Sequence, residues 1–401
     1  MLVVRVNGEP LELADVGAVS FLDAHLARLR VLPAHGNRKL HYDQLFLGLL
    51  LGFFNPVIRS LRLIEGCGDF NGRLDLDRLA RSTTADALAT FDPGHLKPVI
   101  DDLNAKAGHL RRGDDSLRGI AQRIIAGDGT YLNTLADVAW ALKQRRRDGR
   151  VQGQVRLNFQ LDVANWTPQV VSVSGDDGSE PAAFAKDLLA GVLYVLDRNF
   201  VDFDFLRQLL AKANDFVLRV RGNAPAARTV RTLPVTAADA EAGVVSDEVV
   251  TLTGRGAPAG EFRLVVIHAV NRKGEVEVIR LLTSLTDNGA VPARLVGEIY
   301  RRRWQIELFF KWLKTWAGLD HLLSTTRNGI TMQFYVAVIA VLLMYVQLGR
   351  RVSRYALASL HLLLHGQITF GQMMLTLERR ERERALARAR QAARRAAKKL
   401  P

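Results

Sequence analysis

Five side chains near residue 307 share the spacing of one helix face. The sequence from 299 to 314 is IYRRRWQIELFFKWLK, and the five are Tyr300, Arg303, Glu307, Lys311 and Lys314. On a helix they fall within a stripe about 80° wide. A carboxylate beside cations is usually a surface ion pair, but an aromatic in the stripe and apolar flanks indicate a half-buried helix. We interpret the stripe as one metal-binding acid among phosphate-binding groups.

Two aspartates stand where an apolar run gives way to polar residues. Asp128 lies between two glycines after RIIAG, and Asp197 follows GVLYVL. Taken alone, Asp128 is more simply interpreted as a turn residue. A charge after a fully apolar run, as at Asp197, is costly unless it is paired. Both aspartates are expected at the ends of buried strands, where ligands approach an open sheet.

Together with Glu307, these aspartates form the set of acids that two-metal phosphoryl transfer requires. Mg²⁺ prefers oxygen ligands and keeps several waters, so two or three carboxylates are sufficient to bind it. Two ions about 3.5–4 Å apart can activate an attacking oxygen and stabilise a leaving one. Glu307 alone could be only the ion-pair partner of Arg303, so the hypothesis depends on the three acids together.

The composition favours a polyanion as partner. The chain has 401 residues, a formal net charge of +14 and a hydrophobic fraction of 48%. An excess of this size is typical of nucleic-acid-binding proteins, with a merely basic globular protein as the alternative. The single cysteine, Cys67, excludes an intramolecular disulfide and a cysteine-based zinc site, and it fits a reducing compartment.

Neither a signal peptide nor a membrane span is expected. The N-terminal residues MLVVRVNGEPLELADVG lack a basic segment followed by a long apolar one. Residues 334–348 are strongly apolar, but this run is shorter than the roughly 20 residues of a spanning helix. We therefore predict that it forms a buried helix.

The elements that must position the acids change in type along the chain. Residues 2–14 have the pattern of a hairpin, and residues 19–110 that of successive helices. From about residue 122, strands and helices alternate, which predicts a mixed α/β sheet. Residues 222–286 are strand-like, and the chain is helical again from about residue 290.

Two further segments have patterns compatible with DNA binding. Residues 75–91 show a helix, a short polar break and a second helix, with Ser82 or Thr83 as the cap of the second. A helix-turn-helix and an ordinary helical hairpin fit this pattern equally well. Residues 378–401 hold ten Lys or Arg and three Glu. They predict a disordered tail or a solvated helix that binds phosphates non-specifically.

The stripe resembles a known family signature. Tyr300, Arg303, Glu307 and Lys314 match the pattern Y-(2)-R-(3)-E-(6)-K of the IS4-type insertion-sequence transposases. GDGTYL and VLDRNF are similar to the two aspartate motifs of that family, and the resemblance covers roughly residues 20–350. It implies a ribonuclease-H-like mixed sheet flanked by helices and interrupted by a β-rich insertion, with a helical N-terminal domain and a helical C-terminal region.

The resemblance also implies roles for the site residues. The implied catalytic and metal-binding triad, which would hold two Mg²⁺ ions with Mn²⁺ as a substitute, is Asp128, Asp197 and Glu307. The implied phosphate-binding residues are Tyr300, Arg303 and Lys314. Lys311 lies on the stripe but outside the signature, so we rank it lower. Trp304 could stack on a displaced base, but core packing is the role that we favour for it.

The implied reaction is cleavage at transposon ends, followed by attack of the freed 3′ hydroxyl on target DNA. The implied partners are double-stranded DNA, as terminal inverted repeats and target, and a second copy of the chain in the DNA-bound synaptic complex. No membrane partner is expected, and a nucleoid-associated place in the bacterial cytoplasm is expected. Two alternatives stay open: a DDE-type nuclease or repurposed protein that acts without strand transfer, and a non-catalytic DNA-binding protein.

The expected regions of the chain follow from these sequence patterns and from the resemblance to the family. They are a mainly helical DNA-binding region (1–115), the first part of the catalytic domain (116–221), a β-rich insertion (222–288), the second part of the catalytic domain with the glutamate helix (289–350), and a helical C-terminal region with a basic tail (351–401).

Overall fold

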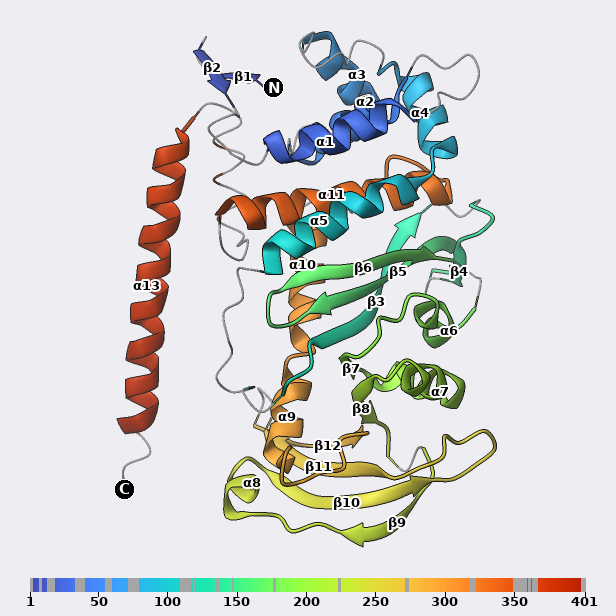
Figure 1. The fold of residues 1–401 in the computed structure, drawn as a ribbon, viewed down its shortest axis with the longest axis vertical. Helices are drawn as coiled ribbons and strands as arrows, with labels where there is room; N and C mark the ends of the chain where they lie inside the picture. The colour runs from blue at the N-terminus through green and yellow to red at the C-terminus, as the bar shows by residue number, and fades with distance from the viewer. Residues whose placement is uncertain are drawn as a thin grey trace.

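The structure of the chain is a computed structural model in which helices gather beside one large twisted sheet (Figure 1). It describes residues 3–6, 9–12, 19–32, 40–54, 60–70, 79–108, 117, 120–134, 138–145, 148–175, 178–222, 225–270, 274–316, 322–348, 359, 362 and 367–397.

The N-terminal part is helical after a short hairpin, as its sequence predicts. Strand β1 (Val3–Val6) pairs antiparallel with β2 (Glu9–Glu12). The helices that follow are α1 (Val19–Arg30), α2 (Tyr42–Phe54), α3 (Leu61–Phe70), α4 (Arg81–Thr90) and α5 (Lys97–Gly108). Apolar side chains at helical spacing, such as Leu45, Phe46 and Leu49 in α2, supply the buried faces.

The break predicted at Ser82 and Thr83 is wrong, because α4 runs through both residues. The helix begins after Ala80, and no side-chain hydrogen bond caps its first turn. Thr84 is fully buried, so core packing rather than a polar cap holds this end of α4. Arg78 and the segment just before it lie outside the described residues, and the helix-turn-helix interpretation stays a prediction.

A sheet of ten strands forms the centre of the described structure. Its strands are β3 (Ile124–Thr134), β4 (Leu142–Arg145), β5 (Val151–Asp162), β6 (Thr167–Ser174), β7 (Leu193–Leu196), β8 (Asp215–Val220), β9 (Ala227–Thr232), β10 (Val244–Leu252), β11 (Phe262–Val270) and β12 (Val276–Thr283). Their order is β4-β5-β3-β7-β8-β12-β11-β10-β9, with β6 also beside β5. Strands β3, β7 and β8 are parallel and the other pairs are antiparallel. The predicted mixed sheet is therefore present.

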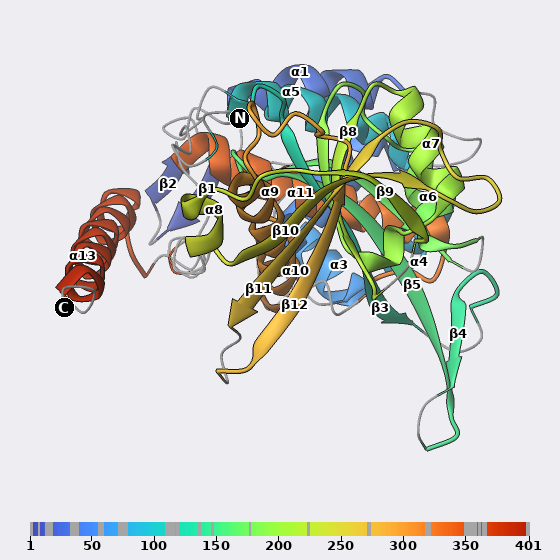
Figure 2. The same cartoon turned by 90° about the horizontal axis from the view of Figure 1, so that it is seen from below.

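The strands β9 to β12 continue the central sheet. Strand β12 pairs antiparallel with β8, which places Thr283 beside Val217. The short helix α8 (Ala237–Glu241), which the sequence did not predict, lies between β9 and β10. In Figure 2, which looks from below, strands β10, β11 and β12 fan out in front of the rest of the sheet.

Each face of the sheet has its own hydrophobic core, because successive strand residues point to opposite faces. One face is covered by α6 (Glu180–Ala185) and α7 (Phe203–Ala211). The other is covered by α9 (Ala293–Arg301), α10 (Trp304–Trp316) and α11 (Arg327–Leu348). Ile125 and Tyr194 belong to the first core. Their neighbours Ala126 and Val195 belong to the second.

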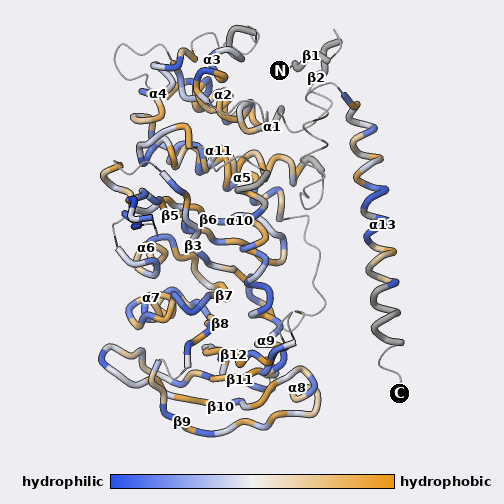
Figure 3. The backbone as a smooth tube through the Cα atoms, turned by 180° about the vertical axis from the view of Figure 1, so that it is seen from behind, coloured by the Kyte–Doolittle hydropathy of each residue, from blue (hydrophilic) through white to orange (hydrophobic). Residues whose placement is uncertain are grey.

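Helix α11 is a core helix, as predicted for residues 334–348. By length and composition it could cross a membrane, but 83% of its most apolar stretch is buried inside the protein. It packs against α2, α4, α5 and β6. Figure 3 shows it as a mainly hydrophobic band between the N-terminal helices and the sheet.

The basic tail is helical through residue 397. Helix α13 (Phe370–Ala397) lies to one side of the sheet in Figure 1. Its described side chains beyond Leu377 are almost all exposed. Of the two expectations for the tail, the solvated helix is the one observed.

Candidate active site

Asp128 and Asp197 lie in one row on the face of the sheet that α10 covers. The parallel register of β3 and β7 pairs Ala126 with Val195, and each aspartate comes two residues later, on the same face. Asp197 follows β7 directly, as predicted. The expected strand end at Asp128 is wrong, because β3 continues to Thr134 by pairing with β5 after its pairing with β7 stops.

The glycines on either side of Asp128 face the opposite side of the sheet, where α6 comes close. A Cβ on Gly127 would lie 2.5 Å from Phe184, and one on Gly129 would lie 2.2 Å from Oε1 of Glu180. The ring of Phe184 leaves no room for a side chain at Gly127, and a side chain at Gly129 would force the carboxylate of Glu180 to move. The Gly-Asp-Gly motif is therefore explained by close packing rather than by a turn.

Glu180 is a fourth carboxylate near the aspartates, and no motif in the sequence singles it out. Ser179 caps α6 by accepting a hydrogen bond from the N–H of Ala182. Burial, followed by the charge of Asp197, raises the pKa of the Glu180 carboxyl. The only signal in the sequence was the start of a short helix, which carries no information about the distance to Gly129.

The segment predicted as one helix is two helices joined by a tight turn. Helix α9 ends at Arg301 and α10 begins at Trp304. Across the junction, the N–H of Arg303 donates to the carbonyl of Tyr300, three residues earlier, at 3.0 Å. This is the spacing of a 3₁₀ turn. The prediction of a single straight stripe is wrong, although Tyr300 and Glu307 still meet at Arg303.

Arg303 joins the acid on the strand to the acid on the helix. Its Nη1 lies 3.2 Å from Oδ2 of Asp128, and its Nη2 forms an ion pair with Oε1 of Glu307. The side chains of Arg303 and Asp128 are only 15% and 16% exposed, and that of Glu307 is 41% exposed. The ion pair of Arg303 with Glu307 is therefore not confined to one helix surface. The same guanidinium also contacts Asp128 on β3, which is distant in the sequence.

Tyr300 lies in the last turn of α9, and its hydroxyl contacts the guanidinium of Arg303. Burial raises the pKa of its hydroxyl, and the guanidinium groups of Arg303 and Arg219 oppose this shift by their charge and by hydrogen bonding. Arg219 belongs to β8 and was not singled out in the sequence. The structure therefore gathers Tyr300, Arg303, Asp128 and Glu307 at one place.

The remaining predicted residues are on α10. Lys311 is exposed, one turn beyond Glu307. Lys314 is in the helix, but its side chain lies outside the described residues. The favoured core-packing role of Trp304 is wrong, because this residue is 47% exposed. The core contacts of α10 come instead from residues such as Phe309, whose ring centroid is 5.1 Å from that of Phe159.

The pKa of the Asp128 carboxyl is raised, although an arginine beside an aspartate usually lowers it. Burial raises its pKa from 3.8 to about 7, the charge of Arg303 lowers it, and the charges of Asp197 and Glu180 add to the rise. The desolvation of a partly enclosed carboxylate therefore outweighs its ion pair.

The raised pKa of Asp128 predicts a loss of stability as the pH rises. Below about pH 4 the carboxyl is protonated in the folded and the unfolded state. Between pH 4 and 7 only the unfolded state releases its proton, and the folded state becomes less stable. We expect Asp128→Asn to raise the free energy of unfolding by about 3–4 kcal/mol at pH 8 but by only about 1 kcal/mol at pH 4.5. Urea unfolding in EDTA measures this difference, and an equal gain at both pH values would contradict it.

Comparison with known proteins identifies the family to which this chain belongs. The sequence profile of the transposase DDE domain matches residues 121–343, more than half of the chain and all of the acids described above. The chain belongs to the transposase DDE family. The resemblance to insertion-sequence transposases is thereby confirmed.

Relatives of this transposase domain include two proteins named as transposases. A Synechocystis protein named as the transposase of insertion sequence element IS4SA is 29% identical over 316 residues, 76% of this chain and 80% of that protein. A Sinorhizobium fredii protein named as the transposase y4zB is 23% identical over 212 residues, 52% of this chain and 57% of that protein. The match therefore spans only part of the second relative.

A solved structure is also similar to this transposase chain. It is the piggyBac transposase in its synaptic complex with hairpin DNA, with a TM-score of 0.38 and 13% sequence identity over 90% of this chain and 79% of that one. The similarity is too low to support any statement about the chain described here.

The transposase DDE family implies divalent metal ions, and the chemistry of the acids fits them. Carboxylate oxygens are the ligands that hard cations prefer, and Asp128 and Asp197 share one row with Glu307 near it. Among the described residues, no three acids are yet close enough together to bind one ion. The guanidinium of Arg303 is bonded to two of the three, so it would have to move when an ion binds.

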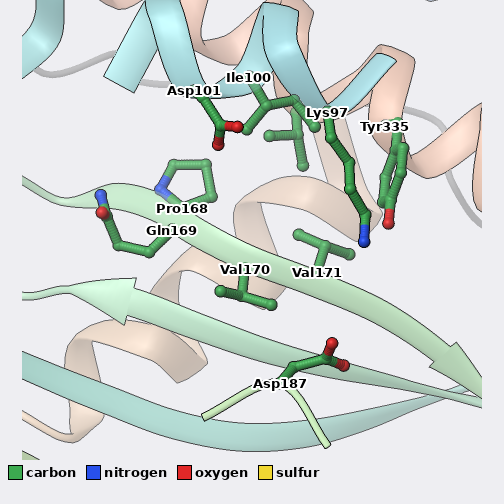
Figure 4. A pocket seen from close by; sticks show the side chains of 10 residues that line it. Lys97, Ile100, Asp101, Pro168, Gln169, Val170, Val171, Asp187 and Tyr335 are labelled. Carbon is green, nitrogen blue, oxygen red and sulfur yellow. The ribbon is translucent and has the colours of Figure 1, made fainter. Parts of the chain in front are cut away.

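A separate cavity of about 180 Å³ lies between α5, α11 and β6 (Figure 4). Lys97 and Tyr335 lie next to one another there, over Val170 and Val171 of β6. None of the predicted site residues of the transposase domain lines this cavity. It belongs to the packing between the N-terminal helices and the sheet.

Proposed function

We propose that the protein cleaves DNA at the ends of its own element and joins the freed 3′ ends to target DNA by two-metal phosphoryl transfer. The observation that carries the proposal is the bridge from Arg303 to Asp128 and Glu307. Asp128 and Arg303 are 175 residues apart in the chain. Membership in the transposase DDE family supports the class of reaction.

We further propose a ribonuclease-H-like catalytic domain. Its support is the strand order β6-β5-β3-β7-β8, in which three antiparallel strands are followed by two strands parallel to β3. Strands β9 to β12 would then be the β-rich insertion between Asp197 and Glu307. Helices α1 to α5 would belong to an N-terminal DNA-binding region.

The acids are proposed to hold two Mg²⁺ ions, with Mn²⁺ as a substitute. The proposed ligands are Asp128, Asp197 and Glu307. When bound, the ions would polarise the scissile phosphate and lower the pKa of an attacking water. Arg303 would keep Asp128 and Glu307 close together before DNA arrives and would then turn to a phosphate oxygen.

The cations of the site are proposed to hold the DNA backbone. Arg303 can bond a phosphate with two parallel N–H groups, with Tyr300 beside it. Lys314, with Lys311 as a weaker candidate, would hold a phosphate further along α10. The exposed ring of Trp304 is suited to stacking on a displaced base.

The proposed partners are double-stranded DNA and a second copy of the chain. The net charge of +14 favours binding to a polyanion. Two element ends must be processed together, so a homodimer in the DNA-bound synaptic complex is expected.

One assay separates the proposal from its alternatives. Purified protein is given Mg²⁺ or Mn²⁺, a duplex with the terminal inverted repeat of its own element, and a target plasmid. Joined products support the transposase. Cleavage without joining supports the nuclease alternative, and binding without cleavage under either metal supports the non-catalytic one.

The basic tail is expected to add non-specific affinity for DNA. Each phosphate contact contributes about 0.9 to the slope of log K against log salt. Removing residues 378–401 should lower that slope by at least about 2, because ten cations are lost. Filter binding to random duplex DNA at several salt concentrations measures it.

A full-length control separates charge from helix length. It carries Gln at Arg388, Arg390, Arg394 and Arg395. A reduced slope in this variant shows that charge is responsible, whereas an unchanged slope in both variants would show that the tail does not contact DNA.

A further inference from the structure

Arg219 lies in the same row as the two aspartates. Strands β7 and β8 are parallel neighbours, and Leu196 pairs with Leu218. Asp197 and Arg219 each come one residue later, so both point to the face that α9 and α10 cover. Neighbouring strands are about 4.8 Å apart. The row across β3, β7 and β8 therefore holds two acids, Asp128 and Asp197, followed by the cation Arg219.

Two contacts hold the Arg219 side chain. Its Nη2 lies 2.5 Å from Oε1 of Glu277 on β12. Leu281 is the direct cross-strand partner of Arg219, and Glu277 lies four residues before it, on the same face. Arg219 also reaches the hydroxyl of Tyr300, since α9 packs over β8.

These contacts form a chain that ends at the acids. It runs from Glu277 through Arg219 and Tyr300 to Arg303, and from there to Asp128. Glu277 belongs to the β-rich strands that follow β8. Strand β12 is thus connected to the site by side chains as well as by the sheet.

We propose that Arg219 is an additional DNA-phosphate-binding residue of the active site, held ready by Glu277. This inference rests on the proposed function and extends it, because it assigns a binding role outside the four-residue signature. Two observations favour phosphate over a purely structural role. The side chain of Arg219 is still 27% exposed, and strand register puts it in one row with Asp128 and Asp197.

Glu277 is assigned a positioning role only. Its side chain is 46% exposed, so its ion pair with Arg219 can exchange for a DNA phosphate at small cost. Glu277 itself is not expected to contact DNA, because a carboxylate repels phosphate.

The test compares Arg219→Gln, Arg219→Lys and Glu277→Gln with a matched control. The control is Arg231→Gln, which breaks another arginine–glutamate pair of the same sheet, Arg231 with Glu261 at 2.8 Å. Thermal unfolding confirms that each variant is folded. Binding to terminal duplex DNA is measured in EDTA over a range of salt, and cleavage is measured in Mg²⁺.

A phosphate contact predicts different results for the two partners. Arg219→Gln should lower the salt slope of binding by about 1 and slow cleavage by about tenfold or more. Arg219→Lys keeps the charge, so the slope should stay while cleavage slows, because the planar fork is lost. Glu277→Gln should leave the slope unchanged. A merely structural pair would instead give Arg219→Gln and Glu277→Gln the same loss of stability and no change in slope.

The outcomes also separate this inference from the proposed function. If the wild-type protein cleaves its DNA and Arg219→Gln equals Arg231→Gln in slope and rate, the inference is overturned and the proposed function stands. If the wild-type protein cleaves nothing but Arg219→Gln still lowers the slope, the proposed function fails and the phosphate contact stands.

Discussion

Replacing Glu307 with Gln is expected to slow cleavage of terminal DNA by at least about a thousandfold, because the proposed metal ligand, worth several kcal/mol of transition-state stabilisation, would be lost. Asp128→Asn should have the same effect. DNA binding should be unchanged or tighter in both variants, since each removes a negative charge that faces phosphate. Single-turnover cleavage and binding to the same duplex measure the two quantities separately.

A neighbouring acid provides the control. Glu298 lies on α9 and pairs with Arg301 and Arg302, and it has no place in the proposed site. Glu298→Gln should cleave within about threefold of the wild-type rate, the scale of a lost surface ion pair. Cutting at the wild-type rate by Glu307→Gln or Asp128→Asn would reject the assignment of the acids.

Asp247→Asn is expected to lower the free energy of unfolding by about 3–5 kcal/mol, the cost of leaving a buried charge without its partner. Arg263 and Asp247 are both fully buried, and two hydrogen bonds of 2.6 Å join them. A third, from Nη1 of Arg263 to the carbonyl of Val291, is also 2.6 Å long. This last bond holds the chain just before α9, so the loss should also loosen the helix that carries Tyr300.

An exposed pair of the same type sets the comparison. Arg231 and Glu261 are 51% and 43% exposed, so Glu261→Gln should cost no more than about 1 kcal/mol. Urea unfolding of both variants at one pH measures the difference. Equal effects would show that the buried pair does not stabilise the fold as its burial indicates.

Much of the local structure could be predicted because it depends on neighbours in the chain. Helical spacing of apolar residues predicted the N-terminal helices and the buried helix α11. Alternating or continuous apolar runs predicted the strand that carries Asp128 and the strand that Asp197 follows. The four-residue signature also pointed to the correct family, because its residues are close together in the sequence.

The errors have a common cause in tertiary packing. The signature segment breaks into α9 and α10, although its helical spacing gave no sign of a turn. Strand β3 extends past Asp128 because β5 pairs with it, and the sequence of β3 does not reveal how far a partner reaches. Trp304 is apolar and lies two residues before the buried Ile306, yet its position on α10 turns it outward.

The amino-acid sequence by itself determined the types of group available, namely three acids and a set of cations at a recognisable spacing, together with most of the elements that carry them. Only the tertiary structure decided which groups share a place. Arg219 and Glu180 enter the neighbourhood of the acids through strand register and through the absence of a side chain at Gly129. Such neighbours arise from hydrogen bonding and close packing between distant segments, which residue spacing along one chain does not encode.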